Sequence, residues 1–387
     1  MLTTKKKKIV RIHSRSDRPE NVLQKESEIF EKCGEIQEEL PEYLRGFFRY
    51  LRSDVLPMTQ LAYLRDILAF FRYLTEETDL TKAKTPRDIT LEELRKVRAA
   101  DVNRYLDYCR RYQVESNSVI TVYENGNKTL ARKKSSLSVL FRQLYREELL
   151  EKNITDGFNP IRVQKPGERE IKALRDEEVR DMLEAVTTGA GLTEHEKAYW
   201  EKTRKRDKAI LVLFLTYGLR LSELQQLNLS SFNLRRGEFK IYRKRGKESV
   251  MPMNQSVTKV LRDYIETERP SSEKLDEESR DALFLSMRGR RMTARQIREL
   301  VKKYTSIVMH TSRKAGYSPH KLRATAATSL IERGNSIFDV AALLDHEQVT
   351  TTQLYAKPRQ NAKEDLVRDM EWETEREKQN EEGDNDK

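Results

Sequence analysis

The sequence predicts a mainly α-helical protein of two domains, in which an all-α domain precedes a mainly helical domain with one small antiparallel β-hairpin. Apolar residues recur at helical spacing through much of the chain, as at Leu64, Ile67 and Phe71. The clearest strand-like runs are short and lie in the second half, at residues 238–242 and 249–253. The chain of 387 residues has the length of two ordinary domains with tails.

The first domain is expected at residues 26–165 and consists of four helical patterns. Pro57 lies near the first turn of the second pattern, where proline is tolerated because N–H groups have no helical partner there. Thr90 precedes the third pattern as an N-cap. Residues 119–123, followed by an Asn-Gly pair, are typical of a small hairpin or of a loop insertion. The four helices are expected over residues 40–51, about 57–74, 91–112 and 129–150.

The second domain is expected at residues 166–363, after a linker. Residues 159–167 interrupt the helical pattern with two prolines and a glycine. The last expected helix ends at Gly334, because glycine often follows a helix C-terminus. The turn between the two strands is basic and contains Lys244. The helices are expected over residues 176–186, 206–217 and 322–333.

The charge of the chain is unevenly distributed. The net charge is +11. Residues 364–387 form an acidic tail with 11 acidic and 4 basic residues, a charge of −7, so the rest of the chain carries +18. Residues 1–25 form a basic flexible arm, which either contacts a DNA backbone or only solubilises the protein. This balance favours a nucleic-acid partner, although a basic protein without such a partner has the same composition.

Several classes of chemistry lack their motifs. Cys33 and Cys109 share no disulfide or zinc-ligand spacing, and the five histidines form no HExxH motif. The phosphate-binding GxxxxGK[ST] loop, the GxGxxG motif and the GxSxG nucleophile elbow are absent. Apolar runs are too short to span a membrane or to form a signal peptide. We therefore expect a cytoplasmic protein, with no membrane partner, that uses no metal or nucleotide cofactor.

Cationic and hydrogen-bonding residues follow one another at intervals in the second half. Each of them alone also suits an ordinary structural role. An arginine can pair with a nearby glutamate, a histidine and an arginine can cap and solvate a helix turn, and a tyrosine can be half-buried packing. The lysine can be one of several interchangeable backbone contacts. In chain order the residues are Arg220, Lys244, His320, Arg323, His346 and Tyr355.

This ordered set resembles the tyrosine recombinase (phage integrase) family, whose hallmark is Arg, Lys, HxxR, His or Trp, and Tyr in this order. The intervals also match, with 22 residues between Arg323 and His346 and eight between His346 and Tyr355. The resemblance covers about residues 35–365, because the four-helix segment resembles the core-binding, SAM-like domain of that family. It implies that residues 166–363 are the catalytic domain.

The chemistry of DNA strand transfer explains the arginines. Phosphodiester transfer builds negative charge on the non-bridging oxygens of the reacting phosphate, and fixed cationic donors stabilise that charge. Guanidinium groups are planar, bidentate and permanently charged. The resemblance accordingly implies that Arg220 and Arg323 bind the scissile phosphate and that His346 donates a further hydrogen bond to it.

The resemblance implies that Tyr355 is the nucleophile, which forms a 3′-phosphotyrosyl enzyme and leaves a free 5′-hydroxyl. A phenol has an ordinary pKa of about 10, so it needs a cationic pocket or a base in order to react, and His320 is the candidate base. Lys244 is the expected general acid for the 5′-oxygen. Because the covalent bond conserves the energy of the phosphodiester, rejoining needs no ATP.

Three positions depart from the pattern of that family. Asp345 stands where the family commonly has the glycine of an LGH motif. Its carboxylate is expected either near the phosphate, where it weakens binding, or facing away at a helix start. The two residues after the nucleophile include no histidine. Arginines flank Lys244 where a glycine is usual, so Lys247 is a second candidate for the general acid.

The expected partner is double-stranded DNA, which the resemblance places between two domains that form a C-shaped clamp. Because the family works as a tetramer on two DNA sites, a homotetramer is expected, with accessory recombination factors as further partners. Basic residues at the start of the fourth helix and in the hairpin turn are candidate DNA contacts, although those in the helix also suit a solvated face. These candidates are Arg132, Lys133, Lys134, Arg243 and Arg245.

The expected function is that of a mobile-element integrase or a Xer-like resolver of chromosome dimers. One alternative is a DNA-binding protein of the same fold without turnover, but the intact set of Arg220, Arg323 and Tyr355 argues against it. Another is a type IB topoisomerase, which shares the chemistry and relaxes supercoils as a monomer. Dependence of the reaction on a specific DNA sequence would favour the recombinase over the topoisomerase.

Overall fold

The computed structural model describes residues 18–116, 119–164, 171–243, 246–346 and 349–355. It is mainly helical with two small antiparallel sheets within these residues, which confirms the predicted fold class. The chain divides into two compact units, Met1–Arg169 with Lys240–Ser249 and Glu170–Phe239 with Val250–Lys387. Most of the expected basic arm and the whole acidic tail lie outside the described residues.

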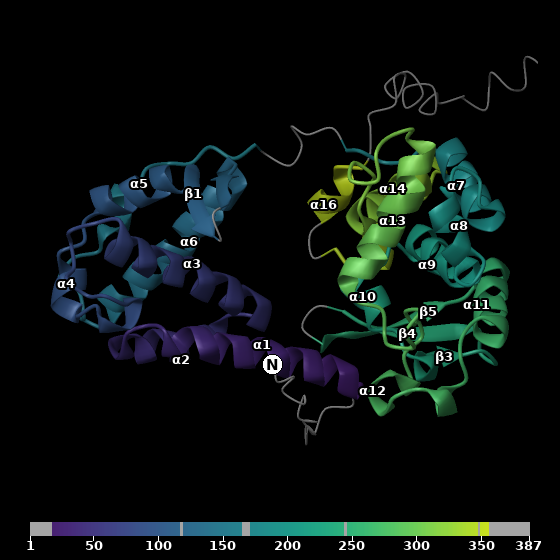
Figure 1. The fold of residues 1–387 in the computed structure, drawn as a ribbon, viewed down its shortest axis with the longest axis horizontal. Coiled ribbons are helices and arrows are strands. Elements are labelled where there is room, and N and C mark those ends of the chain that lie inside the picture. The colour runs from purple at the N-terminus through teal and green to yellow at the C-terminus, as the bar shows by residue number, and fades with distance from the viewer. Residues whose placement is uncertain (1–17, 117–118, 165–170, 244–245, 347–348, 356–387) are drawn as a thin grey trace, which may run out of the picture. The chain divides into compact units, whose positions relative to one another are not determined.

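The first unit consists of packed helices and one hairpin (Figure 1). Two long helices, α3 and α6, lie against each other, and α1 packs on α3. The helices are α1 (Glu20–Glu38), α2 (Arg45–Asp54), α3 (Pro57–Glu76), α4 (Leu91–Arg95), α5 (Ala99–Tyr108) and α6 (Asn127–Arg146), with short 3-10 helices at Glu42–Leu44, Pro86–Asp88 and Ile154–Gly157.

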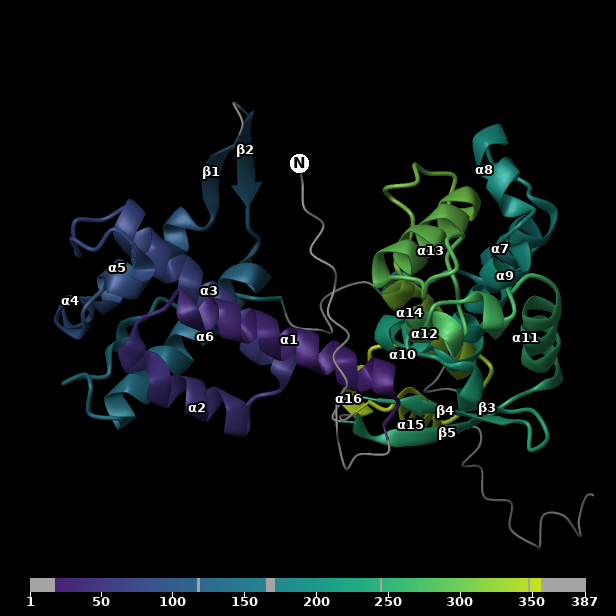
Figure 2. The same cartoon turned by 60° about the horizontal axis from the view of Figure 1, so that its bottom comes forward.

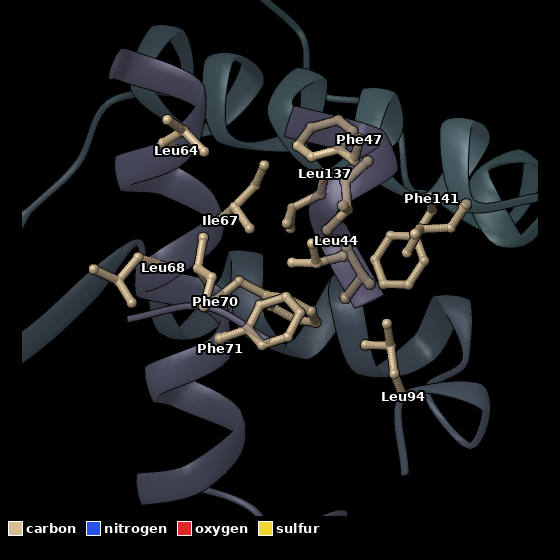
Figure 3. Packing of buried hydrophobic residues seen from close by; sticks show 14 of the residues in the cluster. Leu44, Phe47, Leu64, Ile67, Leu68, Phe70, Phe71, Leu94, Leu137 and Phe141 are labelled. Atoms are coloured by element: carbon tan, nitrogen blue, oxygen red, sulfur yellow. The ribbon is translucent and has the colours of Figure 1, made fainter. Parts of the chain in front are cut away.

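The core of this unit forms around the apolar stripe of α3. Leu64, Ile67 and Phe71 are fully buried. Figure 3 shows these side chains gathered with Phe47 of α2 and Phe141 of α6. This cluster joins helices that are distant in the sequence. Each fully buried leucine or phenylalanine in it contributes about 1.5–3 kcal/mol to the stability of the folded unit.

Helix starts in this unit follow local signals. Pro57 is the first residue of α3. Thr90 caps α4, since its hydroxyl accepts from the N–H of Glu93 while the Glu93 carboxylate accepts from the N–H of Thr90. The single helix predicted over residues 91–112 is wrong, because the Asp101 carboxylate accepts from the N–H of Arg98 and starts a second helix, α5.

Helix α1 was not predicted from the sequence, and it begins at Glu20, inside the range expected for a flexible arm. Its sequence is rich in charge, and Cys33 is its one buried residue. Ile29 and Ile36 pack against the core from α1 while remaining partly exposed. An apolar face this narrow gives little periodic signal, so the helix is recognisable only from its contact with α3.

Strands β1 (Arg111–Ser116) and β2 (Val119–Glu124) form an antiparallel hairpin, one of the two alternatives expected near residue 120. The hairpin stands out from the helices of its unit (Figure 2). Tyr112 stacks on Tyr123 across the strands, with ring centroids 5.2 Å apart, and on Tyr108 of α5 at 5.7 Å. These stacked rings connect the base of the hairpin to α5.

The second unit is built around α9 (Arg204–Tyr217), against which α7, α11 and α14 pack (Figure 1). Ile210, Leu213 and Phe214 of α9 are fully buried. The other helices are α7 (Asp176–Thr188), α8 (Glu194–Trp200), α10 (Leu221–Gln225), α11 (Gln255–Thr267), α12 (Glu277–Arg280), α13 (Ala294–Val308), α14 (Pro319–Glu332), α15 (Ile337–Leu344) and α16 (Val349–Gln353), with short 3-10 helices at Leu229–Ser231 and Ser272–Lys274.

A three-stranded antiparallel sheet has the order β3 (Phe232–Asn233), β4 (Glu238–Tyr242) and β5 (Glu248–Pro252). The β4 strand has the predicted bounds, and β5 begins and ends one residue earlier than predicted. Tyr217 joins the end of α9 to this sheet. Its hydroxyl donates to the carbonyl of Pro252 at 2.7 Å, and its ring meets that of Phe239 edge-on at 5.0 Å.

Within the described ranges, no helix is long and apolar enough to cross a lipid bilayer.

Candidate active site

Arg220 lies in the tight turn between α9 and α10. The turn begins at Gly218, whose φ of +56° favours glycine, and a side chain there would overlap that of Leu344. Arg220 is the N-cap of α10. The carboxylate of Glu223 accepts from its main-chain N–H at 2.7 Å and from its Nη1 at 2.8 Å. Because Glu223 is almost fully buried, it holds the guanidinium of Arg220 in one place.

Arg323 of α14 is buried, with 4% of its surface exposed. Its Nη1 donates to the carbonyl of Gly218 at 2.7 Å, and its Nη2 donates to the carbonyl of Leu344. Gly218 ends α9 and Leu344 ends α15, and the last carbonyls of a helix have no partner within it. Arg323 thus joins three helices, and these neutral acceptors do not cancel its positive charge.

Asp345 ends α15 in the left-handed conformation, with φ and ψ both 53°. Aspartate adopts this conformation more readily than most residues other than glycine. Its carbonyl accepts from Nη2 of Arg220 at 2.9 Å, and its carboxylate Oδ2 lies 3.4 Å from Nη1. The carboxylate therefore lies beside Arg220 and does not face away.

His346 follows Asp345 directly and is held by α16. Its Nδ1 lies 2.7 Å from the hydroxyl of Thr352, which is fully buried. Burial and the positive charges of Arg323 and Arg220 lower the pKa of His346 to about 4. At neutral pH the ring is therefore uncharged. When the Thr352 hydroxyl donates to Nδ1, the hydrogen of the ring is on Nε2 and can be donated to a ligand.

Tyr355 lies just beyond the end of α16, and its ring stacks on that of His346 with centroids 6.2 Å apart. It is 9% exposed and packs with Ala327, Val340 and Leu344. Burial raises the pKa of Tyr355, and the charge of Arg323 acts in the opposite direction. The phenol is therefore neutral at physiological pH in this structure.

His320 is the second residue of α14, three positions before Arg323 on the same helix. Desolvation of the ring, followed by the positive charges of Lys321 and Arg323, lowers the pKa of His320 although the residue remains exposed. Its charge also contributes to the lowered pKa of His346, so the two histidines belong to one electrostatic group.

The hairpin turn is described only in part. Lys244 and Arg245 lie outside the described residues. Arg243 is 6% exposed, and its main-chain N–H donates to the carbonyl of Lys247 at 2.8 Å. The roles of Arg243, Lys244, Arg245 and Lys247 stay predictions.

The three basic residues at the start of α6 have partners within the protein. Arg132 pairs with the buried carboxylate of Asp66, from which Nζ of Lys133 lies 3.6 Å away. Nζ of Lys134 donates to the carbonyl of Asn159 at 2.7 Å. The side chain of Lys133 is 13% exposed and that of Arg132 is 45% exposed. Of that pair, Arg132 has the larger accessible surface, and DNA binding by all three stays a prediction.

Sequence reasoning missed the site role of Thr352 and considered Glu223 only as an ordinary partner of Arg220. The spacing of Arg220 and Glu223 matches an N-terminal capping box, so that pairing had a local signal. The contact between Thr352 and His346 joins α16 to the end of α15, and no local signal in the sequence indicated it. Within the described residues, no group of three or more His, Cys, Asp or Glu side chains could hold a metal ion.

Comparison with known proteins identifies the family of this chain. Residues 172–362 match the Phage integrase family. The tyrosine recombinase XerC of Pelotomaculum thermopropionicum is 31% identical over 231 residues, which are 59% of this chain and 69% of the relative. XerC of Lactobacillus leichmannii is 30% identical over 311 residues, 80% of this chain and 92% of the relative.

Solved structures share the fold at lower identity. The XerH recombinase bound to its difH substrate superposes with a TM-score of 0.55 at 16% identity, over 90% of this chain and 95% of that chain. The Tn1549 transposon integrase in complex with a circular intermediate DNA gives 0.57 at 15% identity, over 88% and 99%. The chain belongs to the tyrosine recombinase family, as the sequence pattern indicated, and is a site-specific recombinase.

Proposed function

We propose that this protein cleaves and rejoins double-stranded DNA through Tyr355, with Arg220, Arg323 and His346 binding the scissile phosphate. The observation that carries the proposal is the meeting of these side chains at the end of α15. Arg323 donates to the carbonyl of Leu344 and Arg220 to that of the next residue. His346 comes next in the chain and stacks against Tyr355.

In the proposed reaction, Oη of Tyr355 attacks the phosphorus and the bond from phosphorus to the 5′-oxygen breaks. The phenolic proton passes to His320, whose lowered pKa keeps it unprotonated at neutral pH and able to accept a proton. The 5′-oxygen takes a proton from Lys244, or from Lys247 as the second candidate. A 3′-phosphotyrosyl bond and a free 5′-hydroxyl result, and the reverse steps rejoin a strand without a cofactor.

The two guanidinium groups suit different parts of the phosphate. Arg323 is buried and fixed by two carbonyls, so its charge is shielded from bulk water. The side chain of Arg220 is 33% exposed and provides the accessible edge. Two fixed cations of this kind stabilise the charge that develops on the non-bridging oxygens, without reorganisation during the reaction.

We propose that the helical part of the first unit, over the predicted range of residues 26–165, is the core-binding domain, and that the catalytic domain spans residues 166–363. DNA backbone contacts would come from basic residues of both, including Arg132 and Arg245. Affinity should fall steeply as salt is raised if several phosphates are neutralised.

We further propose that the chain acts as a homotetramer on two recombination sites, as a mobile-element integrase or a Xer-like resolver. The similarity to XerC proteins over most of the chain supports the resolver, and the fold shared with the Tn1549 integrase supports the integrase. Recombination between two plasmid-borne sites, with the products sized on a gel, separates both from a topoisomerase that relaxes any plasmid.

Covalent trapping tests the central proposal. The full chain is mixed with nicked duplexes tiled from the DNA that flanks its own gene, and the mixture is run on a denaturing gel. Wild-type protein should give a protein–DNA band that Tyr355→Phe abolishes. Tyr145→Phe, which alters an exposed tyrosine of α6, is the matched control and should retain the band. A band with Tyr355→Phe would contradict the nucleophile, and salt-sensitive binding without any band would favour a non-catalytic DNA-binding protein.

A further inference from the structure

We propose that the carboxylate of Asp345 competes with the scissile phosphate for Arg220 and so holds the activity of the site below what its cations allow. The inference rests on the proposed function, because it assigns Arg220 to that phosphate. It starts from an ion pair between Oδ2 of Asp345 and Nη1 of Arg220, at 3.4 Å.

The carboxylate is not needed to position Arg220. Glu223, which is almost fully buried, accepts from Nη1 of Arg220 at 2.8 Å. The main-chain carbonyl of Asp345 accepts from Nη2 at 2.9 Å, and a residue of any type at that position supplies this carbonyl. Two anchors therefore remain when the side chain of Asp345 is removed, and the guanidinium keeps its place.

The carboxylate changes the charge of the site instead. Arg220 and Arg323 contribute two positive charges, while Glu223 and Asp345 contribute two negative ones, and His346 is uncharged at neutral pH. Among these five residues the sum is zero. Without the carboxylate of Asp345 it becomes +1, which favours a phosphate and favours its more negative transition state further.

The carboxylate also occupies a hydrogen-bond donor. A guanidinium has five N–H groups, and three of those of Arg220 point to Glu223, to the carbonyl of Asp345 and to its carboxylate. Two N–H groups are then left for a phosphate, and removal of the carboxylate leaves three. The side chain of Asp345 is 20% exposed, so its carboxylate is partly accessible to solvent and to a competing phosphate.

The backbone explains why a carboxylate can stand at this position. The residue has φ of +53°, a conformation that glycine, asparagine and aspartate adopt most readily. Aspartate therefore preserves the turn that presents His346 while adding a negative charge beside Arg220. Asparagine preserves the same turn without the charge, so Asp345→Asn isolates the electrostatic effect.

The first arm of the test needs no DNA. Thermal unfolding of the full chain is followed with increasing inorganic phosphate, which stabilises the native state in proportion to its binding. Asp345→Asn should gain more stability from phosphate than wild type. Arg220→Ala should gain less stability from phosphate than wild type, because it lacks the proposed phosphate ligand. Asp339→Asn removes the same charge from an exposed position at the start of α15 and should behave as wild type. Equal phosphate responses in Asp345→Asn and Asp339→Asn would overturn the proposal.

The second arm measures covalent adduct formation on the trapping duplex. Asp345→Asn should form the adduct faster by a factor on the order of ten, mostly through the rate at saturating DNA, since the transition state is more negative than the bound phosphate. An unchanged or slower rate, with an adduct in wild type, would overturn the proposal. If wild type forms no adduct, the proposed function fails, while the phosphate arm still decides whether Asp345 competes for Arg220.

Discussion

The hydroxyl of Thr352 provides a sharp test of how His346 is oriented. Thr352 is fully buried on α16, and its Oγ1 lies 2.7 Å from Nδ1 of His346. Thr352→Val replaces the hydroxyl with a methyl group of similar size, so the packing is kept while the hydrogen bond is lost. The ring of His346 then loses the contact that fixes which nitrogen carries its hydrogen.

The size of the effect follows from that one bond. A hydrogen bond of this kind contributes about 1 kcal/mol net, and a nitrogen left without its partner in a partly buried place costs about 1–3 kcal/mol. If the bond is needed in the transition state, about 1 kcal/mol corresponds to a rate lower by a factor of about five. The affinity for DNA should change little, because Thr352 is buried and acts through His346.

The assay compares the rate of covalent adduct formation at saturating duplex with the dissociation constant of the same duplex. Thr351→Val is the matched control, since Thr351 is the exposed neighbour on the same helix. We expect a lower rate and an unchanged dissociation constant for Thr352→Val, and neither change for Thr351→Val. A wild-type rate in a folded Thr352→Val protein would refute the view that this bond orients His346 for the reaction.

Three further predictions concern stability. Gly218→Ala should lower the unfolding free energy by about 1–2 kcal/mol because of its positive φ alone, and by more because the new methyl group overlaps Leu344. Gly34→Ala, on α1 with open space around it, should not lower it. Chemical denaturation measures the unfolding free energy of both variants. Asp66→Asn should destabilise the protein by about 3 kcal/mol, because Lys133 loses its buried partner. Asp79→Asn, at an exposed position, should change the unfolding free energy little. A similar loss of stability in both variants would contradict the argument. The pKa of His346 is about 4 in the folded protein, against an ordinary value of 6.5, so between these pH values the unfolded chain binds a proton that the folded chain does not. Stability should therefore fall as pH drops from 6.5 towards 4, by less than the ~3 kcal/mol of the full shift because the ring is only partly buried. His346→Asn should flatten that slope in pH-dependent denaturation.

The elements that the sequence predicts correctly are those with local signals. The N-cap of Thr90, the end of the helix predicted over residues 206–217 and the bounds of β4 each depend on neighbours within a few residues. Helix α1 lacks such a signal, because its narrow apolar face has meaning only against α3. The break between α4 and α5 depends on one capping aspartate, Asp101, inside a continuous apolar pattern.

The candidate site was predictable as a set of residues and not as a set of contacts. The order and spacing of Arg220, Arg323 and Tyr355 can be read directly from the sequence. The carbonyls that hold the two arginines lie in turns that are 21, 105 and 125 residues away in the chain. The orientation of Asp345 could not be decided from the sequence, because both expected directions suit a residue at a helix end. Its left-handed backbone and its distance to Arg220 decide between them.

The way in which the arginines are held has a consequence for the chemistry. Carbonyl groups at helix C-termini fix a guanidinium by hydrogen bonds while leaving its net charge in place, whereas carboxylates fix it and offset that charge. Arg323 donates to the carbonyls of Gly218 and Leu344. Arg220 donates to the carboxylate of Glu223 and to the carbonyl of Asp345, and the carboxylate of Asp345 lies beside it. If both arginines bind the scissile phosphate as proposed, the contribution of Arg220 is offset by the carboxylates of Glu223 and Asp345. A change at Asp345 therefore acts on the site through Arg220 and through the neighbouring ring of His346, whose electrostatic environment includes the Asp345 carboxylate.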